Sequence, residues 1–353
     1  MNSEQDAADI SDRTRLFIRL DADHHTGLGH AARVSEILRH ITGPLDIHIC
    51  GSGAQLSLFF SDNITFHILA KNASEEQKCA ILLDLAKKHK ADLLLIDQPG
   101  QTAQSWEAYH NSAFPVIAID DYGGAVQADL VFNGTILEDY HHYPLISGNN
   151  GLYCGGEYAL LNPVFGAVNW AEPASKSLLI VIGGGDRAAA WAMALTGDQS
   201  PFLSPLYPKI TMVVGGAFPE TGALNLACER LGITLQQNIP QSQLAHLLGQ
   251  HSCTLITGGM IVYEALASGC PAIIFPQEEN LMREADWFSD HKMALNLGYD
   301  GGMDMNLVGK MIALSYHNPT CIKQNIIDGK GVIRAAGIID DFCAIKIKDP
   351  KTI

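Results

Sequence analysis

A histidine and an arginine follow a glycine-containing loop near the start of the chain. The loop contains Gly27 and Gly29, and His30 and Arg33 follow where a helical pattern begins. Glycine lets the backbone approach a phosphate, and the free N–H groups of a helix start point toward such an anion. A helix N-terminus also disfavours a charged imidazolium, so the ring stays neutral and available as a base. We therefore predict that His30 is a base beside a site for a phosphorylated or nucleotide-linked substrate.

Two more glycine clusters follow apolar runs in the second half of the chain. Each lies between a predicted strand and a predicted helix, which is the context that a phosphate cradle needs. A glycine cluster at a strand end can also be only a tight turn, and the first cluster leaves both interpretations open. The two clusters are Gly183, Gly184 and Gly185, and Gly258 and Gly259.

Glu264 lies one to two turns into the helix predicted after Gly259. A carboxylate at this place can accept hydrogen bonds from both hydroxyls of a ribose. An isolated helical glutamate is more often only a solvated side chain. The glycines before the helix favour the nucleotide interpretation. The paired histidines at 24–25 and 141–142 have no third ligand at a recognisable spacing, so we expect neither a metal nor a cofactor.

The elements that must position these residues alternate between short apolar strands and helices. Residues 92–97 are apolar except for the aspartate at each end, as in a central parallel strand that is covered on both faces. A loop-rich stretch at 140–170 separates this half from a second α/β half. The pattern predicts two doubly wound, Rossmann-type domains facing across a cleft, with ligands at the carboxyl ends of the strands. We place the domains at residues 14–165 and 166–345.

The composition excludes several classes of protein. The formal net charge of −15 argues against nonspecific binding of nucleic acid, which needs a basic surface. No apolar run reaches the roughly 18 residues of a membrane span, and the polar N-terminus does not resemble a signal peptide. The eight cysteines are scattered without a CxxC pair, which is typical of reduced thiols. We expect a cytoplasmic protein with a small-molecule substrate; the oligomeric state is not readable from the sequence.

The combined pattern resembles the UDP-2,4-diacetamido-2,4,6-trideoxy-β-L-altropyranose hydrolases of pseudaminic acid biosynthesis. Spore-coat polysaccharide proteins with the same domain belong to this wider group, which has the GT-B fold of UDP-sugar glycosyltransferases. The resemblance spans nearly the whole chain, and its most specific parts are the loop before His30 and the segment around Tyr158. The matching segments are residues 19–22, 27–30 with Arg33, 119–121, 155–165, 183–186, 258–259 with 263–265, and 328–331.

The resemblance implies an activity and a set of site residues. Enzymes of this group break the C1–oxygen bond of the sugar with inversion, and His30 is the implied base that activates a water. The implied sugar-binding residues are Asp21, Gly27, Gly29, Arg33, Asp121 and Tyr158. The implied UDP-binding residues are Gly183, Gly184, Gly185, Gly258, Gly259, Glu264 and Asn280. The resemblance implies neither a cofactor nor a metal.

The chain also departs from the pattern of this group. Met260 and Ile261 stand where hydroxyl residues that reach phosphate are common, and Gly185 stands where a serine is usual. The implied diphosphate contacts therefore depend on backbone groups and Asn280. Two alternatives stay open. One is a GT-B glycosyltransferase in which His30 deprotonates a sugar hydroxyl, and the other is a non-catalytic protein that binds a UDP-sugar.

Overall fold

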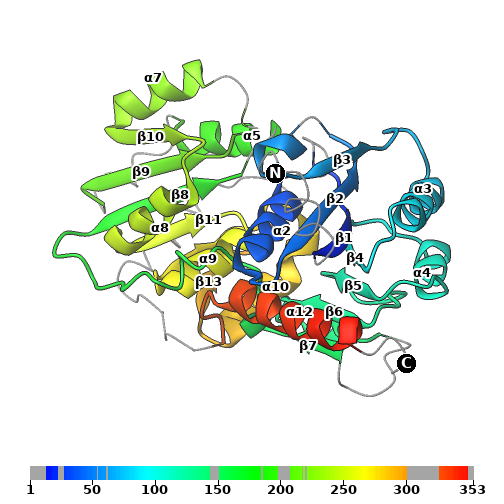
Figure 1. The fold of residues 1–353 in the computed structure, drawn as a ribbon. Coiled ribbons are helices and arrows are strands. Elements are labelled where there is room, and N and C mark those ends of the chain that lie inside the picture. Colours follow the sequence, from blue (N-terminus) through cyan, green and yellow to red (C-terminus); the bar gives the residue numbers. More distant parts are fainter. Residues whose placement is uncertain are drawn as a thin grey trace, which may run out of the picture. The chain divides into compact units, whose positions relative to one another are not determined.

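A computed structural model describes residues 13–22, 28–53, 55–60, 63–143, 151–183, 186–197, 207–216, 218, 221–299 and 326–348. The chain divides into two compact units, whose elements are labelled in Figure 1. The first unit runs to Leu160 and includes the stretch from Gly331 onward, and the second runs from Leu161 to Lys330. Each unit is built on its own parallel sheet.

The sheet of the first unit has seven strands in the order β3-β2-β1-β4-β5-β6-β7. The strands are β1 (Thr14–Arg19), β2 (Leu45–Gly51), β3 (Thr65–Ile68), β4 (Leu93–Ile96), β5 (Val116–Ile119), β6 (Leu130–Asn133) and β7 (Leu152–Cys154). The helices of this unit are α2 (Gly29–His40), α3 (Glu75–Lys88), α4 (Ala103–His110) and α12 (Gly331–Lys348), with short 3-10 turns η1 (Leu56–Leu58), η2 (Glu138–Tyr140) and η4 (Gly156–Tyr158).

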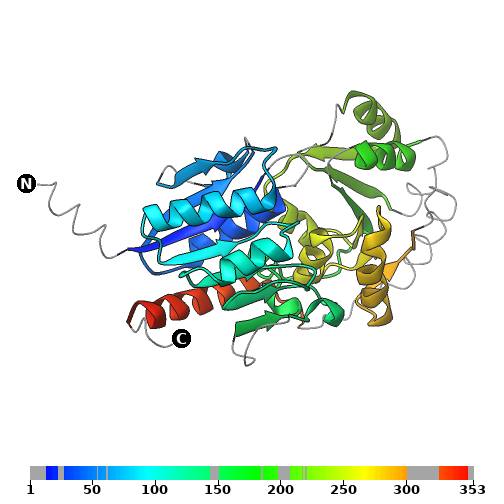
Figure 2. The same ribbon diagram turned by 90° about the vertical axis from the view of Figure 1, so that its right-hand side faces the viewer.

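Helices cover both faces of this first sheet. On one face, Ile37 of α2 and Ala335 of α12 belong to one buried apolar cluster. On the other face, Leu82 of α3 and Trp106 of α4 belong to a second cluster. All four residues of β4 are buried between these layers, which confirms the prediction of a central strand. Figure 2 shows α12, in red, lying along the first unit.

The sheet of the second unit has six strands in the order β10-β9-β8-β11-β12-β13. They are β8 (Ser177–Ile182), β9 (Lys209–Val214), β10 (Ile233–Gln237), β11 (Cys253–Ile256), β12 (Ala272–Ile274) and β13 (Ala294–Asn296). The helices are α5 (Asp186–Leu195), α7 (Gly222–Leu231), α8 (Gln241–Gln250), α9 (Met260–Ser268) and α10 (Met282–Asp290), and η5 (Glu279–Leu281) is a 3-10 turn. The two parallel sheets confirm the doubly wound α/β class.

The strand order reverses once in each sheet. In the first sheet, β2 and β3 lie on one side of β1, and β4 lies on the other side. In the second sheet, β9 and β10 lie on one side of β8, and β11 lies on the other. Open α/β sheets bind ligands at the carboxyl ends of the strands beside such a reversal. The loops after β1 and β4, and after β8 and β11, are therefore the places to look for a site.

The C-terminal helix differs from the predicted domain division. The sequence pattern predicts that residues up to 345 belong to the second domain, but α12 contacts α2 and η4 and belongs to the first unit. Gly331 allows the helix to start there, because a Cβ at this residue would lie 2.2 Å from the carbonyl oxygen of Ala159. The apolar pattern of α12 is helical, but it does not say which sheet the helix covers.

Candidate functional site

His30 lies where the strand order of the first sheet reverses. It is the second residue of α2, which follows β1, and its ring contacts Asp97, the residue after β4. The distance from His30 Nδ1 to Asp97 Oδ1 is 2.8 Å. The His30 side chain is 17% exposed, whereas the Asp97 side chain is completely buried. Two loops that are far apart in the sequence thus bring an imidazole and a carboxylate together.

Arg33 holds the same carboxylate from the next turn of α2. Its Nε donates to Asp97 Oδ2 at 2.7 Å, and its Nη2 donates to Asp97 Oδ1 at 2.5 Å. Its Nη1 donates to Asp121 Oδ1, beyond β5, at 2.8 Å. The flat guanidinium matches a carboxylate in this two-bond geometry. The resemblance implies that Arg33 binds the sugar; in the structure its guanidinium binds two carboxylates and its side chain is largely buried.

The charges in this cluster decide which nitrogen of His30 carries a proton. Burial alone would raise the pKa of Asp97, but the charge and hydrogen bonds of Arg33, with the contact to His30, lower it to about 2. Burial would lower the pKa of Arg33, but Asp121 and Asp97 raise it well above its ordinary value. An ionised carboxylate can only accept, so Nδ1 of His30 is assigned the proton. Nε2 then keeps the lone pair.

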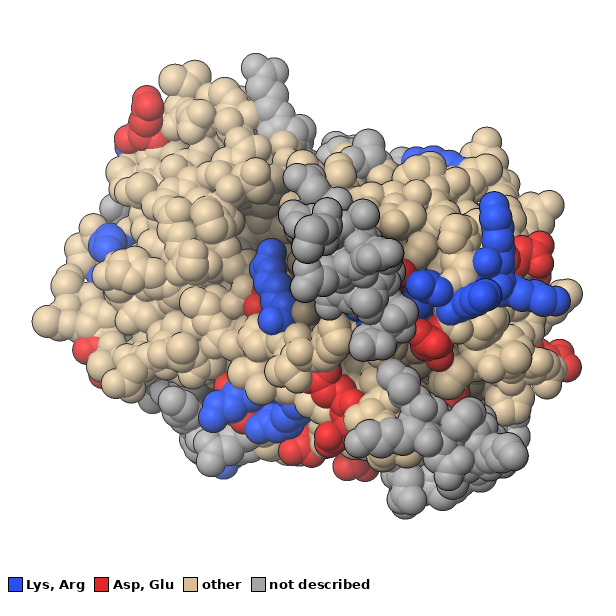
Figure 3. Space-filling view, in the orientation of Figure 1, with Lys and Arg blue, Asp and Glu red and all other residues tan. Residues whose placement is uncertain are grey.

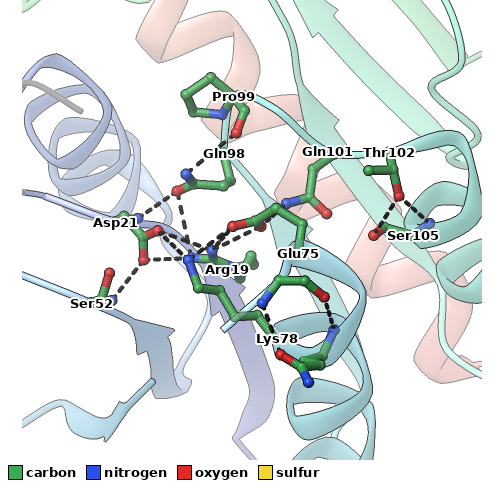
Figure 4. Close-up of polar contacts among 12 residues, drawn as sticks. Arg19, Asp21, Ser52, Glu75, Lys78, Gln98, Pro99, Gln101, Thr102 and Ser105 are labelled. Atoms are coloured by element: carbon green, nitrogen blue, oxygen red, sulfur yellow. Dashed lines mark hydrogen bonds and ion pairs between the residues drawn. The ribbon is translucent and has the colours of Figure 1, made fainter. Parts of the chain in front are cut away.

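Asp21 belongs to a buried ion-pair network at the same edge of the sheet (Figure 4). Arg19, which is completely buried, donates to the two oxygens of Asp21 at 2.7 and 3.0 Å. The backbone N–H of Ser52 donates to Asp21 Oδ1 at 2.6 Å. The side-chain carbonyl of Gln98 accepts from the backbone N–H of Asp21 at 2.7 Å. The network therefore ties the loop after β1 to the loop after β4.

Two residues of α3 complete the network. Glu75 accepts from Arg19 Nη2 at 2.9 Å and from Lys78 Nζ at 2.9 Å, and Lys78 Nζ also lies 3.5 Å from Asp21 Oδ2. Burial alone would raise the pKa of Asp21, but the hydrogen bond and charge of Arg19 lower it. Asp21, which the resemblance implies is a sugar-binding residue, is thus buried with both carboxylate oxygens hydrogen-bonded inside the protein.

The structure describes three other predicted sugar-binding residues, which are Gly29, Asp121 and Tyr158. Gly29 is the first residue of α2, and a Cβ there would meet nothing within 4 Å. The Asp121 side chain, which binds Arg33, is 37% exposed. Tyr158 ends η4 and packs edge-on against Tyr153, with ring centroids 5.5 Å apart. Within the described residues no hydrogen bond or ring contact joins Tyr158 to His30, and Gly27 lies outside those residues.

Gly258 and Gly259 lie between β11 and α9, beside the reversal in the second sheet. Both have positive φ, at 94° and 78°, which glycine adopts without strain. Gly259 is the N-cap of α9 and has no side chain to cap it, so the first N–H groups of the helix can face an anion. Gly183 follows the neighbouring β8 and is exposed. Gly184 and Gly185 lie outside the described residues.

Asn280 lies close to this glycine pair. It is an exposed residue of η5, the turn that precedes α10. The next residue, Leu281, packs against the loop, because a Cβ on Gly258 would lie 3.1 Å from its Cδ1. The structure therefore places η5 beside the loop that precedes α9.

Glu264 lies in the second turn of α9 and is half-buried. Burial raises the pKa of its carboxyl group to about 8. Among the described residues, no hydrogen bond or ion pair to this carboxyl group is present. A buried acid without a partner costs stability, and such groups collect at functional sites.

Two kinds of feature are absent from the residues that the structure describes. Among them, no three His, Cys, Asp or Glu side chains are grouped so that they could hold a metal ion. Nor is any described helix both long and apolar enough to cross a membrane. On the face drawn in Figure 3, Lys and Arg side chains lie among Asp and Glu side chains and form no broad basic patch.

Asp97 is a residue of the candidate site that the sequence pattern did not predict. The signal was its position directly after the most apolar strand of the first half of the chain. A charged residue at the carboxyl end of a buried parallel strand faces the edge where ligands bind. The contact with His30 depends on β1 and β4 being neighbours, and no local pattern states which strands pair.

The chain is similar in sequence to a spore coat polysaccharide biosynthesis protein. No protein-family model matches the chain. The chain is 26% identical over 336 residues to the spore coat polysaccharide biosynthesis protein SpsG of Bacillus subtilis (strain 168). The matched region covers 91% of this chain and 96% of that protein.

Solved structures of low sequence identity have the same fold. The UDP-GlcNAc 2-epimerase from Neisseria meningitidis bound to UDP-GlcNAc has a TM-score of 0.58 at 15% identity, covering 94% of this chain and 100% of that chain. MurG from Acinetobacter baumannii has a TM-score of 0.61 at 13% identity, covering 94% of this chain and 99% of that chain. The fold is therefore the GT-B-like, two-domain α/β fold of glycosyltransferases and epimerases.

Proposed function

We propose that this chain hydrolyses a UDP-linked 2,4-diacetamido-2,4,6-trideoxy sugar to UDP and the free sugar, in the synthesis of a pseudaminic-type nonulosonic acid. The observation that carries the proposal is the 2.8 Å contact of His30 with the ionised Asp97, which leaves Nε2 as a base. The broader function, processing of a UDP-sugar, is supported by the similarity to SpsG and to an epimerase bound to UDP-GlcNAc. The hydrolytic step rests on the resemblance of the segments around His30 and Tyr158.

In this reaction a water molecule is the nucleophile. Nε2 of His30 takes a proton from the water while the water oxygen attacks C1 of the sugar. The bond between C1 and the UDP oxygen breaks, and its electron pair leaves with UDP. Attack on the side opposite UDP inverts the configuration at C1. The Nδ1–H of the imidazolium stays hydrogen-bonded to Asp97, whose negative charge stabilises the new positive charge.

The second unit would bind the leaving group. The uncapped start of α9 after Gly258 and Gly259 offers N–H groups to the diphosphate. Asn280 adds a side-chain amide beside the same loop. Glu264, one turn further along α9, would accept hydrogen bonds from the ribose hydroxyls. Backbone groups thus replace the hydroxyl side chains that Met260 and Ile261 do not provide.

A glycosyltransferase is the second candidate. The observation that favours it is the fold, which solved structures of glycosyltransferases share over nearly the whole chain. The same residues would serve, because only the nucleophile differs: His30 would deprotonate a sugar hydroxyl instead of water.

Release of UDP from a panel of UDP-diacetamido-trideoxy sugars tests the proposal. General-base catalysis contributes about 10²–10⁴-fold, so His30→Ala should lower kcat by that range while UDP binding persists. His40→Ala at the other end of α2 is the matched control and should keep full activity. Unchanged turnover in His30→Ala would contradict the assignment. Release only after an acceptor is added would indicate a transferase, and UDP binding without any release would indicate a binding protein.

A further inference from the structure

We propose that Arg33 is a positioning residue for the base: by binding both oxygens of Asp97, it prevents that carboxylate from drawing a second proton onto His30. This role rests on the proposed function of His30. The positioning role explains why a cation lies at this loop edge although the substrate could scarcely reach it, since the Arg33 side chain is only 11% exposed.

The contacts of Asp97 show why a counter-charge is needed. Its side chain is completely buried, and its charged contacts among the described residues are Arg33 and His30. Without Arg33, a buried carboxylate would have the imidazole as its remaining partner, 2.8 Å away. A buried negative charge favours the protonated form of a neighbouring base. The ring would then carry a proton on each nitrogen, and Nε2 could not accept one from a nucleophile.

Arg33 acts on the ring directly as well. Its Nη2 lies 3.0 Å from His30 Nδ1, and a cation at this distance disfavours an imidazolium. Asp121 holds the guanidinium from its far side through Nη1 at 2.8 Å. Among the residues that the structure describes, the charged groups that face His30 are Arg33 on its own helix and Asp97 after β4, with Asp121 after β5 bound to Arg33. One guanidinium between two carboxylates keeps the ring neutral and its Nδ1 proton directed at Asp97.

Histidine-ring NMR titrations on the protein without substrate test this role. Arg33→Gln should move the titration of the His30 ring to higher pH by about one unit, which is a tenfold change in the fraction of neutral ring. Arg33→Lys keeps the charge but loses the two-bond geometry, and should show a smaller shift. The control is Arg39→Gln, which removes the same charge from a 63% exposed side chain on the same helix and should leave the His30 signals unchanged.

Kinetics separate this role from a merely structural one. With a substrate that turns over, Arg33→Gln should lower kcat/KM at pH 6.5 by about tenfold, and the loss should shrink at pH 8.5, where the ring loses its extra proton. An equal loss at both pH values, or a His30 titration that matches Arg39→Gln, would overturn the proposal.

A second variant keeps the proposal falsifiable if Arg33→Gln does not fold. Asp121→Asn removes a partly exposed carboxylate that holds the guanidinium of Arg33. Arg33 is then held less firmly against Asp97, so the His30 titration should shift. No shift in this variant would overturn the role of the clamp. If no UDP-sugar is hydrolysed but the NMR shifts occur, the proposed reaction fails while the positioning role stands.

Discussion

Replacing Glu264 with glutamine should stabilise the protein and weaken its binding of a nucleoside. The carboxyl group is half-buried on α9 without a described partner, and burial raises its pKa from the usual 4.5 to about 8. Between these two pH values the folded state keeps a proton that the unfolded state has released. Stability therefore falls as the pH rises through this window, and the full cost is present above about pH 8.

The size of this cost follows from the shift in pKa. Each pH unit corresponds to about 1.4 kcal/mol, so the complete shift would amount to about 5 kcal/mol. Because the side chain is only half-buried, solvent screening reduces this value, and we expect Glu264→Gln to gain about 2 kcal/mol at pH 8.5. At pH 5 the carboxyl group is protonated in the folded protein, and this pH lies only about half a unit above the ordinary pKa of 4.5, so the gain should be small.

Urea unfolding at pH 5 and pH 8.5 measures this difference. The control is Glu229→Gln, which removes an exposed carboxylate from α7 in the same unit and should change little at either pH. A gain that is the same at both pH values, or no gain beyond that of the control, would refute the reasoning about burial.

Uridine binding measures the second half of the prediction. Uridine has no phosphate whose own titration would obscure the result. At pH 8.5, where the carboxyl group is ionised, loss of its charged hydrogen bonds to the ribose should weaken the affinity by about tenfold or more in Glu264→Gln. An unchanged Kd would exclude Glu264 as the ribose partner.

Three further predictions concern the rest of the molecule. His48 and His67 stack with ring centroids 5.2 Å apart, and burial lowers the pKa of each below 6.5. The stability of the fold should therefore fall as the pH drops below 6.5. Measurements of Tm at pH 7.5 and 5.5 check this, and His67→Asn should reduce the difference between the two values. Asp21→Asn leaves Arg19 with one buried partner fewer and should cost about 3 kcal/mol in urea unfolding. Gly258→Ala forces a side chain into a φ of 94° and toward Leu281, and should weaken UDP binding about tenfold by calorimetry.

Local patterns were sufficient to predict most elements of the fold. The apolar run of β4 and the helical spacing of α2 predict these elements closely, because burial on both faces or on one stripe imposes those periods. The pattern of α12 could not say which unit it joins, because that depends on the close approach at Gly331.

The candidate site could be predicted in part. The glycine loops predict where α2 and α9 start, because glycine and a helix start have local signatures. The partners of Arg33 could not be predicted, since Asp97 and Asp121 meet it only when β1, β4 and β5 lie side by side. The same limit explains Asp21, whose burial depends on Arg19 and on Glu75 from α3.

The most direct test of the proposed reaction is turnover in ¹⁸O-labelled water with wild type and His30→Ala. The proposed mechanism predicts one labelled oxygen at C1 of the free sugar, unlabelled UDP, and loss of this product in His30→Ala. Label in UDP would mean that water attacks phosphorus, and it would contradict the role of His30 as the base for attack at C1.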